Sequence, residues 1–202
     1  MARGLMNFNL ARFDSQNKFS FPDIPAYTSK IDVDSIRWLD YESARKRSSS
    51  GLHFYCDDYR YNGIWQDPVK YVDFISRFEN IIQFDFSLYY DYPVALQIFN
   101  KYRNHWLSAF YSSLLDIQFI PNISVSTSDC WEWSFDGFPS NSVVAFSDIG
   151  AIRDNSSRNI TYQAYEETIR RLSPLQVIYF TRSKKNAPSE ADVVQVPFLK
   201  ER

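Results

Sequence analysis

Leu52-His53-Phe54-Tyr55-Cys56-Asp57-Asp58-Tyr59 is the stretch of the sequence that decides the predicted fold. It begins with apolar, strand-forming residues and ends in two neighbouring carboxylates. A buried strand carries charge at its tip when that tip opens onto a site. Four later apolar runs also end in polar side chains, so we expect the same design to recur through the middle of the chain.

The four later runs have the composition and length of β-strands: residues 81–87, 117–125, 142–148 and 175–181. Between the runs, apolar residues recur at spacings of three and four, which is typical of helices that bury one face. This spacing predicts three helices: residues 67–78, 91–115 and 160–173. The segment from 126 to 140 has no helical period, and we predict a long loop or a small hairpin there.

Strands that alternate with helices require crossover connections, and a crossover makes the two strands that it joins parallel. We therefore predict an α/β fold with a mostly parallel five-stranded sheet and crossover helices. Five strands are too few for a closed eight-stranded barrel, so we expect the sheet to be half-barrel-like or open. We divide the chain into three parts: an N-terminal extension and linker (residues 1–50), an α/β domain (51–182) and a C-terminal tail (183–202), of which residues 193–199 would pair with a sheet edge.

Charge and composition exclude several classes of protein. The net charge is −2, but residues 51–150 carry −7 whereas the flanking parts carry +2 and +3. An acidic middle repels phosphate backbones unless metal ions intervene, so broad electrostatic binding of DNA is not the expected main function. The two Cys and two His lack the spacing of a zinc site. No stretch approaches about 20 apolar residues, and the first residues do not form a signal peptide, so we expect a cytoplasmic protein with no membrane contact.

The basic run Arg45-Lys46-Arg47 is followed directly by Ser48-Ser49-Ser50. Such a run is most often a solvated linker. The alternative is that it touches phosphate or a partner.

The predicted functional site lies where the carboxyl ends of the strands meet, since this edge holds the ligands of parallel α/β sheets. The candidate catalytic residues are Asp57, Asp58, Asp85, Ser87 and Arg60. The candidate ligands of a divalent cation, Mg²⁺ or Mn²⁺, are Asp57, Asp85, Asp136 and Asp148. Paired carboxylates would alternatively share a proton and act as acid and base. The structural alternative is that each Asp caps a helix or turn.

Two motifs indicate a family. Asp57-Asp58-Tyr59-Arg60-Tyr61-Asn62 resembles a DDYRFE motif, and Phe84-Asp85-Phe86-Ser87 resembles a PDFS motif. Together they resemble a domain-of-unknown-function family of bacteria, archaea and their viruses, found on phages and mobile elements, and the resemblance covers about residues 52–181. Asn62 stands where the first motif is acidic, and Phe84 stands where the second has proline. The resemblance implies a mobile-element context and brings no established reaction.

These observations lead to two functional hypotheses. The first is a phage or mobile-element enzyme that carries out metal-dependent phosphoester chemistry on nucleic acid or a nucleotide, with Arg60 or Arg103 stabilising charge. The second is a non-catalytic interaction protein that serves replication or antagonises a host defence system through a host protein. Either would act in the host cytoplasm if it is encoded by a phage.

Overall fold

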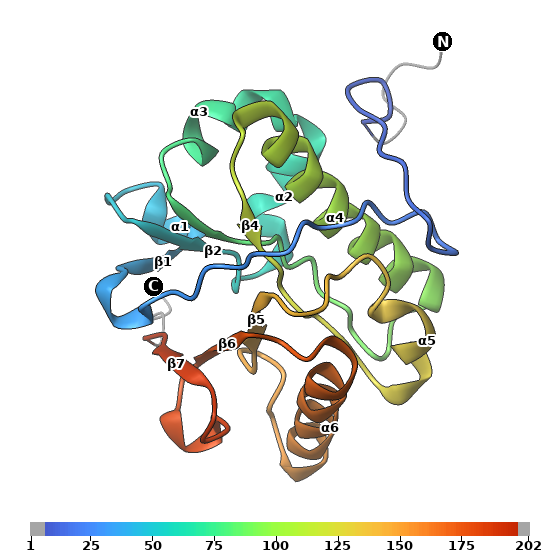
Figure 1. The fold of residues 1–202 in the computed structure, drawn as a ribbon, viewed down its shortest axis with the longest axis vertical. Coiled ribbons are helices and arrows are strands. Elements are labelled where there is room, and N and C mark those ends of the chain that lie inside the picture. The colour runs from blue at the N-terminus through green and yellow to red at the C-terminus, as the bar shows by residue number, and fades with distance from the viewer. Residues whose placement is uncertain (1–6, 198–202) are drawn as a thin grey trace.

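The computed structural model describes residues 7–197, and its strands form two parallel sheets (Figure 1). The first sheet has four strands in this order: β1 (Trp38–Asp40), β2 (Gly51–His53), β3 (Asn80–Ile82) and β4 (Phe119–Ile120). The second has three: β5 (Val143–Ser147), β6 (Gln176–Thr181) and β7 (Asp192–Gln195). Every pairing between neighbouring strands is parallel.

The two sheets are joined edge to edge and curve around a common interior. Pro121 O accepts a hydrogen bond from Ala145 N at 2.8 Å, and Ile123 N donates to Ala145 O at 2.9 Å, so the backbone after β4 continues the ladder to β5. The ring of Phe180 on β6 lies 4.9 Å from the ring of Tyr55 and 5.3 Å from the ring of Trp38, between centroids. Because β6 reaches the first two strands across the interior, the two sheets curve around a shared core, and they do not form a closed barrel.

The α/β class and the parallel pairing confirm the sequence prediction, but the predicted count of five strands is wrong. Residues 7–197 form seven strands, and the two additional strands are β1 and β7. The strand β1 has only three residues, which is too few to show a period of two in the sequence. It is short because Asp40 ends it and caps the next helix, where its carboxylate accepts a hydrogen bond from Ser43 N at 3.0 Å. The strand β7 falls in the predicted tail and pairs with β6, which confirms the expected edge pairing for residues 193–195. Residues 198 and 199 lie outside the described part. The division into extension, domain and tail stays a prediction.

Six α-helices lie within residues 7–197: α1 (Tyr41–Ala44), α2 (Asp58–Gln66), α3 (Val72–Ile75), α4 (Val94–Leu115), α5 (Trp131–Ser134) and α6 (Asn155–Leu172). Four 3₁₀ turns accompany them: Val33–Ser35, Pro68–Tyr71, Ser128–Cys130 and Lys184–Asn186. In this described part of the chain, no helix has both the length and the apolar character to cross a membrane.

The predicted helices differ from the observed ones, and α1 and α2 are not among the predicted helices. The helix expected over 67–78 is a 3₁₀ turn followed by α3, and α6 begins at residue 155 rather than 160 because Asp154 and Ser157 form a capping box. The loop or hairpin expected over 126–140 instead contains α5. The helix α4 ends at Leu115, as the sequence predicts, but it begins at Val94, directly after Pro93, rather than at residue 91.

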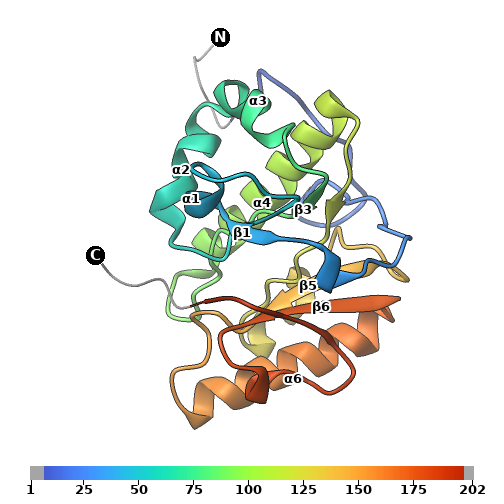
Figure 2. The same ribbon diagram turned by 90° about the vertical axis from the view of Figure 1, so that its left-hand side faces the viewer.

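The alternation of side chains along each strand separates an inner core from two outer cores. On β3, Ile81 packs outward against α2–α4, whereas Ile82 packs inward. On β6, Tyr179 packs outward against α6, whereas Phe180 packs inward. Figure 2 shows α6 lying along β5 and β6 on their outer side. The helices therefore cover only the convex side of the curved sheet.

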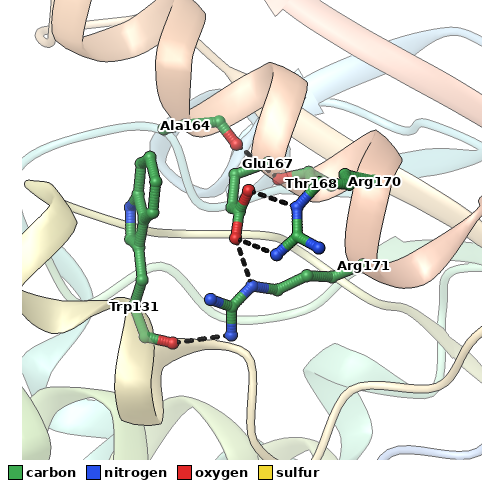
Figure 3. A network of polar contacts seen from close by, with 6 residues as sticks. All are labelled: Trp131, Ala164, Glu167, Thr168, Arg170 and Arg171. Atoms are coloured by element: carbon green, nitrogen blue, oxygen red, sulfur yellow. Dashed lines mark hydrogen bonds and ion pairs between the residues drawn. The ribbon is translucent and has the colours of Figure 1, made fainter.

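A polar network holds the short helix α5 against the C-terminal end of α6 (Figure 3). Arg170 Nε and Arg171 Nε donate to the carboxylate of Glu167 at 2.7 and 2.5 Å, and Arg171 donates to Trp131 O at 3.0 Å. These hydrogen bonds lower the pKa of Glu167 to about 2. The contact between Arg171 and Trp131 joins residues that are distant in the sequence, so the local sequence around α5 does not indicate it.

Candidate functional site

Asp85 lies on the segment that directly follows β3, at the edge of the sheet where the parallel strands end. Its Oδ1 accepts a hydrogen bond from Asn122 Nδ2 at 2.8 Å, and Tyr55 donates from its hydroxyl to Asn122 Oδ1 at 2.9 Å. Burial raises the pKa of Asp85 to about 7, and the charge of Asp58 raises it too, whereas hydrogen bonds from Asn122 and Ser124 oppose the shift. The carboxyl therefore exchanges its proton close to neutral pH.

Asp58 is the first residue of α2 and is turned towards the segment after β3. Its carboxylate accepts hydrogen bonds from Ser87 N at 3.1 Å and from Ser87 Oγ at 2.9 Å. Burial raises the pKa of Asp58, and the two hydrogen bonds from Ser87 counteract this effect. Asp58 and Ser87 thus act together as a clamp between the start of α2 and the chain that carries Asp85.

Two amides on α4, which the sequence reasoning missed, hold the same segment from the other side. Asn104 Oδ1 accepts from Phe86 N at 2.7 Å, and its Nδ2 donates to Phe86 O at 3.1 Å. Asn100 Nδ2 donates to Ser87 O at 2.7 Å. The two amides are four residues apart and so lie on one helix face, which is the only local signal that could have found them.

Arg103 lies beside these amides and brings a cation to the site. Its guanidinium carbon lies 3.6 Å from the centroid of the Phe86 ring, and its two terminal nitrogens donate to Asn62 Oδ1 at 3.1 Å and to Asn100 Oδ1 at 2.5 Å. The Nε atom is buried and has no hydrogen-bond partner among the described residues. Burial lowers the pKa of Arg103, and the charge of Asp58 partly restores it.

Asp57 and Arg60, both candidate catalytic residues, pair with each other away from Asp85. The Asp57 side chain is 64% exposed, and its Oδ2 accepts from Arg60 Nε at 3.1 Å. Arg60 also pairs with Glu42. The carboxylate whose charge acts on Asp85 is that of Asp58, so Asp58 replaces Asp57 in the predicted pair.

The four carboxylates predicted to bind a metal are not brought together. Asp148, at the end of β5, accepts from Thr181 Oγ1 at 2.9 Å, whereas the charge of Asp136 acts on the buried Lys101. Within residues 7–197, no three Asp, Glu, His or Cys side chains form a group that could hold a metal ion. Asp136 follows α5 rather than a strand, and Asp148 is held by Thr181 at the end of β5, so the strand ends do not gather the four carboxylates.

The two histidines belong to the interior. His53 is 1% exposed, and burial lowers its pKa to about 4. His105 Nδ1 lies 2.8 Å from Pro22 O, and its Nε2 lies 2.9 Å from Lys101 Nζ, so the proton on Nδ1 leaves Nε2 to accept from the amine. Burial lowers the pKa of Lys101 well below its usual range. His105 and Lys101 thus hold the N-terminal segment at Pro22 and are not part of the site of Asp85.

Exposed tyrosines gather next to the clamp. The segment after Ser87 contains Tyr89, Tyr90 and Tyr92, which we call the tyrosine loop, and all three side chains are exposed. The rings of Tyr89 and Tyr92 lie 4.9 Å apart between centroids, and Gln97 Nε2 donates to Tyr92 O at 2.9 Å. The site therefore combines two partly buried carboxylates, a stacked guanidinium and accessible aromatic rings.

Comparison with known proteins places the chain among phage proteins. A family model described as "Domain of unknown function (DUF4417)" matches residues 13–197. The chain is 30% identical over 168 residues to "Gene 1 protein" of Mycobacterium phage L5, an alignment that covers 80% of the chain and 71% of that protein. It is 26% identical over 191 residues to "Gene 1 protein" of Mycobacterium phage D29, covering 94% and 68%. No solved structure matches the chain significantly.

Proposed function

Because the chain belongs to the DUF4417 family and is related to phage proteins, we propose that it is a phage-associated enzyme in which Asp85 transfers a proton during phosphoester chemistry. The observation that carries this proposal is the raised pKa of Asp85, about 7, at the carboxyl edge of a parallel sheet. A general acid or base is most effective when its pKa lies near the working pH. Carboxyls whose pKa is shifted by burial and a neighbouring charge cluster at functional sites.

The proposed substrate is a phosphoester in nucleic acid or a nucleotide. Arg103 supplies a positive charge beside Asp58, which favours a negatively charged phosphate group at this site. The tyrosine loop offers ring faces on which bases can stack. These are the two kinds of group that such a substrate needs, one for phosphate and one for base.

Asp58 has two roles in this proposal. Through Ser87 it positions the segment that carries Asp85, and through its charge it raises the pKa of that carboxyl. Mg²⁺ needs only one or two carboxylates, completed by water and phosphate oxygens. If the reaction uses Mg²⁺ or Mn²⁺, Asp58 and Asp85 are the residues that would hold the ion, and Asp85 would then be an ionised ligand rather than the proton donor.

The experiment is a hydrolysis assay of the full chain on a generic phosphodiester, on single-stranded oligonucleotides and on nucleoside triphosphates, with Mg²⁺, Mn²⁺ or a chelator. Asp85→Asn should lower the rate by at least about 100-fold, the usual contribution of a general acid or base. The matched control is Asp116→Asn, which changes an exposed carboxyl at the far end of α4. Equal rates for Asp85→Asn and the wild type would refute the proposal.

The second candidate is a non-catalytic protein that serves replication or antagonises a host defence system, acting on a host protein in the cytoplasm. The tyrosine loop favours it, since exposed tyrosines are enriched in protein interfaces. Replacing Tyr90 and Tyr92 with Ala should then abolish the effect of the protein on its host while Asp85→Asn leaves that effect intact. The opposite pattern supports the enzyme.

A further inference from the structure

A basic hollow lies at the edge of the sheet where β2 and β3 begin, whereas Asp85 lies at the edge where strands end. It has a volume of about 260 Å³. Its lining residues come from two segments distant in sequence: Ala44, Arg45, Lys46, Arg47, Ser48, Ser49, Arg77 and Phe78. The lining thus contains four cations, two hydroxyls and no carboxylate. The basic run Arg45-Lys46-Arg47, for which the sequence favoured a solvated linker, forms part of this lining.

The hollow continues into a second one that extends the row of cations. The second hollow is lined by Arg45, Lys70, Asp73, Phe74 and Arg77, so Arg45 and Arg77 belong to both. None of the five cations forms an ion pair within residues 7–197, and the single carboxylate of the lining is Asp73. The row therefore carries a strong local positive charge on a chain whose net charge is −2.

Aromatic rings hold the two shared guanidinium groups in place. Arg77 lies 4.5 Å from the centroid of the Phe74 ring and donates from Nε to Phe74 O at 3.3 Å. Arg45 lies 5.9 Å from the centroid of the Tyr41 ring. A stacked guanidinium keeps free N–H groups at its rim, and little side-chain entropy is lost when an anion binds there.

We propose that this basic hollow and its extension bind the phosphate backbone of a nucleic-acid strand. Lys and Arg side chains without internal partners are the groups that phosphate contacts use. One phosphate would occupy the first hollow, but the shared Arg45 and Arg77 extend the cations into the second, which suits successive phosphates of a strand. The net charge of the chain is −2, so apart from these five cations the chain carries −7 and has no general attraction for a strand. This binding does not depend on a catalytic role for Asp85.

The test measures binding of a labelled single-stranded oligonucleotide to the full chain by fluorescence anisotropy between about 50 and 200 mM salt. The variant is Lys46→Glu with Arg47→Glu, because both side chains are exposed and make no described contact that the fold needs. The control is Lys184→Glu with Lys185→Glu, an exposed basic pair elsewhere that gives the same change in net charge. Thermal unfolding of both variants verifies that each is folded.

The hollow variant should bind the strand at least about tenfold more weakly, and its plot of log affinity against log salt should be less steep by about 1.4, since each lost contact to single-stranded nucleic acid removes roughly 0.7. The control pair should leave affinity within about twofold of the wild type. Inorganic phosphate or ATP added in competition should displace the strand only at much higher concentration than the unlabelled oligonucleotide.

Three results would overturn the proposal. An equal loss in both variants would show that net charge rather than the hollow determines binding. Displacement by ATP at concentrations as low as those of the oligonucleotide would identify the ligand as a single nucleotide or phosphate. Absence of strand binding by the wild type at the lowest salt would exclude a nucleic-acid surface here.

Discussion

Replacing Asp85 with Asn should stabilise the protein at neutral and higher pH. The wild-type carboxyl must ionise in a buried position, where its charged form is poorly solvated, and Asn keeps the shape and the hydrogen-bond acceptor without the charge. Asn122 Nδ2, which donates to Asp85 Oδ1 at 2.8 Å, can donate equally to the amide oxygen of Asn. The substitution therefore removes a cost and retains the neighbouring hydrogen bond.

The magnitude follows from the pKa. Folding raises the pKa of Asp85 from 3.8 to about 7, and each pKa unit corresponds to about 1.4 kcal/mol, so full ionisation costs the folded state at most about 4 kcal/mol. Because part of the residue is in contact with solvent, we expect a gain of about 2 kcal/mol for the variant.

The sign of the pH dependence is fixed by linkage. Between pH 3.8 and about 7 the folded wild type holds a proton that the unfolded chain releases, so its stability falls as pH rises through this interval and is constant above it. The Asn variant lacks this fall. The difference in free energy of unfolding, measured by urea denaturation at about pH 5 and pH 8, should therefore favour the variant more at pH 8.

Asp116→Asn, which changes an exposed carboxyl, is the control measured at both pH values. The reasoning fails if Asp85→Asn is less stable than the wild type at pH 8, or if its advantage is the same at both pH values. Either result would mean that the carboxyl is ionised without cost in the fold.

Three further substitutions test other parts of the structure. Asp58→Ala leaves Ser87 N without its acceptor and should lower the free energy of unfolding by about 1–3 kcal/mol in urea titrations; an unchanged midpoint would show that the clamp contributes nothing. Gly51→Ala would place a Cβ 2.6 Å from Trp38 Cε3, so it should cost about 1–3 kcal/mol, and wild-type stability would contradict the close packing of β1 on β2. Lys101→Met tests the buried amine. Because the pKa of Lys101 is lowered, the unfolded wild type binds a proton that the folded state lacks. The free energy of unfolding of the wild type should therefore rise between about pH 9 and 10 by up to about 1.4 kcal/mol relative to the variant, and parallel pH profiles would refute this.

The sequence was sufficient to predict the class of the fold because the strand-forming runs and the α4 spacing are local signals. Phe84 and Phe86 flank Asp85 in an apolar run predicted as a strand over 81–87, but β3 ends at Ile82 and Asp85 lies on the segment that follows it. The short elements could not be predicted in the same way. The strand β1 has three residues, and α5 has four, and α5 is held by the contact between Arg171 and Trp131 O.

The composition of the candidate site was only partly predictable. Asp57 and Asp58 are neighbours, and the sequence does not say which of them turns inward, because that depends on where α2 begins. Asn100 and Asn104 look like ordinary polar positions of an amphipathic helix until α4 is docked beside the segment after β3. The role of Asn100 and Asn104 depends on contacts between segments that are distant in the sequence. The same holds for the hollow, whose lining includes both Arg45 and Arg77.

The most direct measurement is the pKa of the Asp85 carboxyl itself, obtained by NMR titration of side-chain carboxyl carbons in the full chain. The account predicts a value near 7, and a lower value in Asp58→Asn because the neighbouring charge is lost. A titration at the ordinary value of 3.8, unaffected by Asp58, would contradict it.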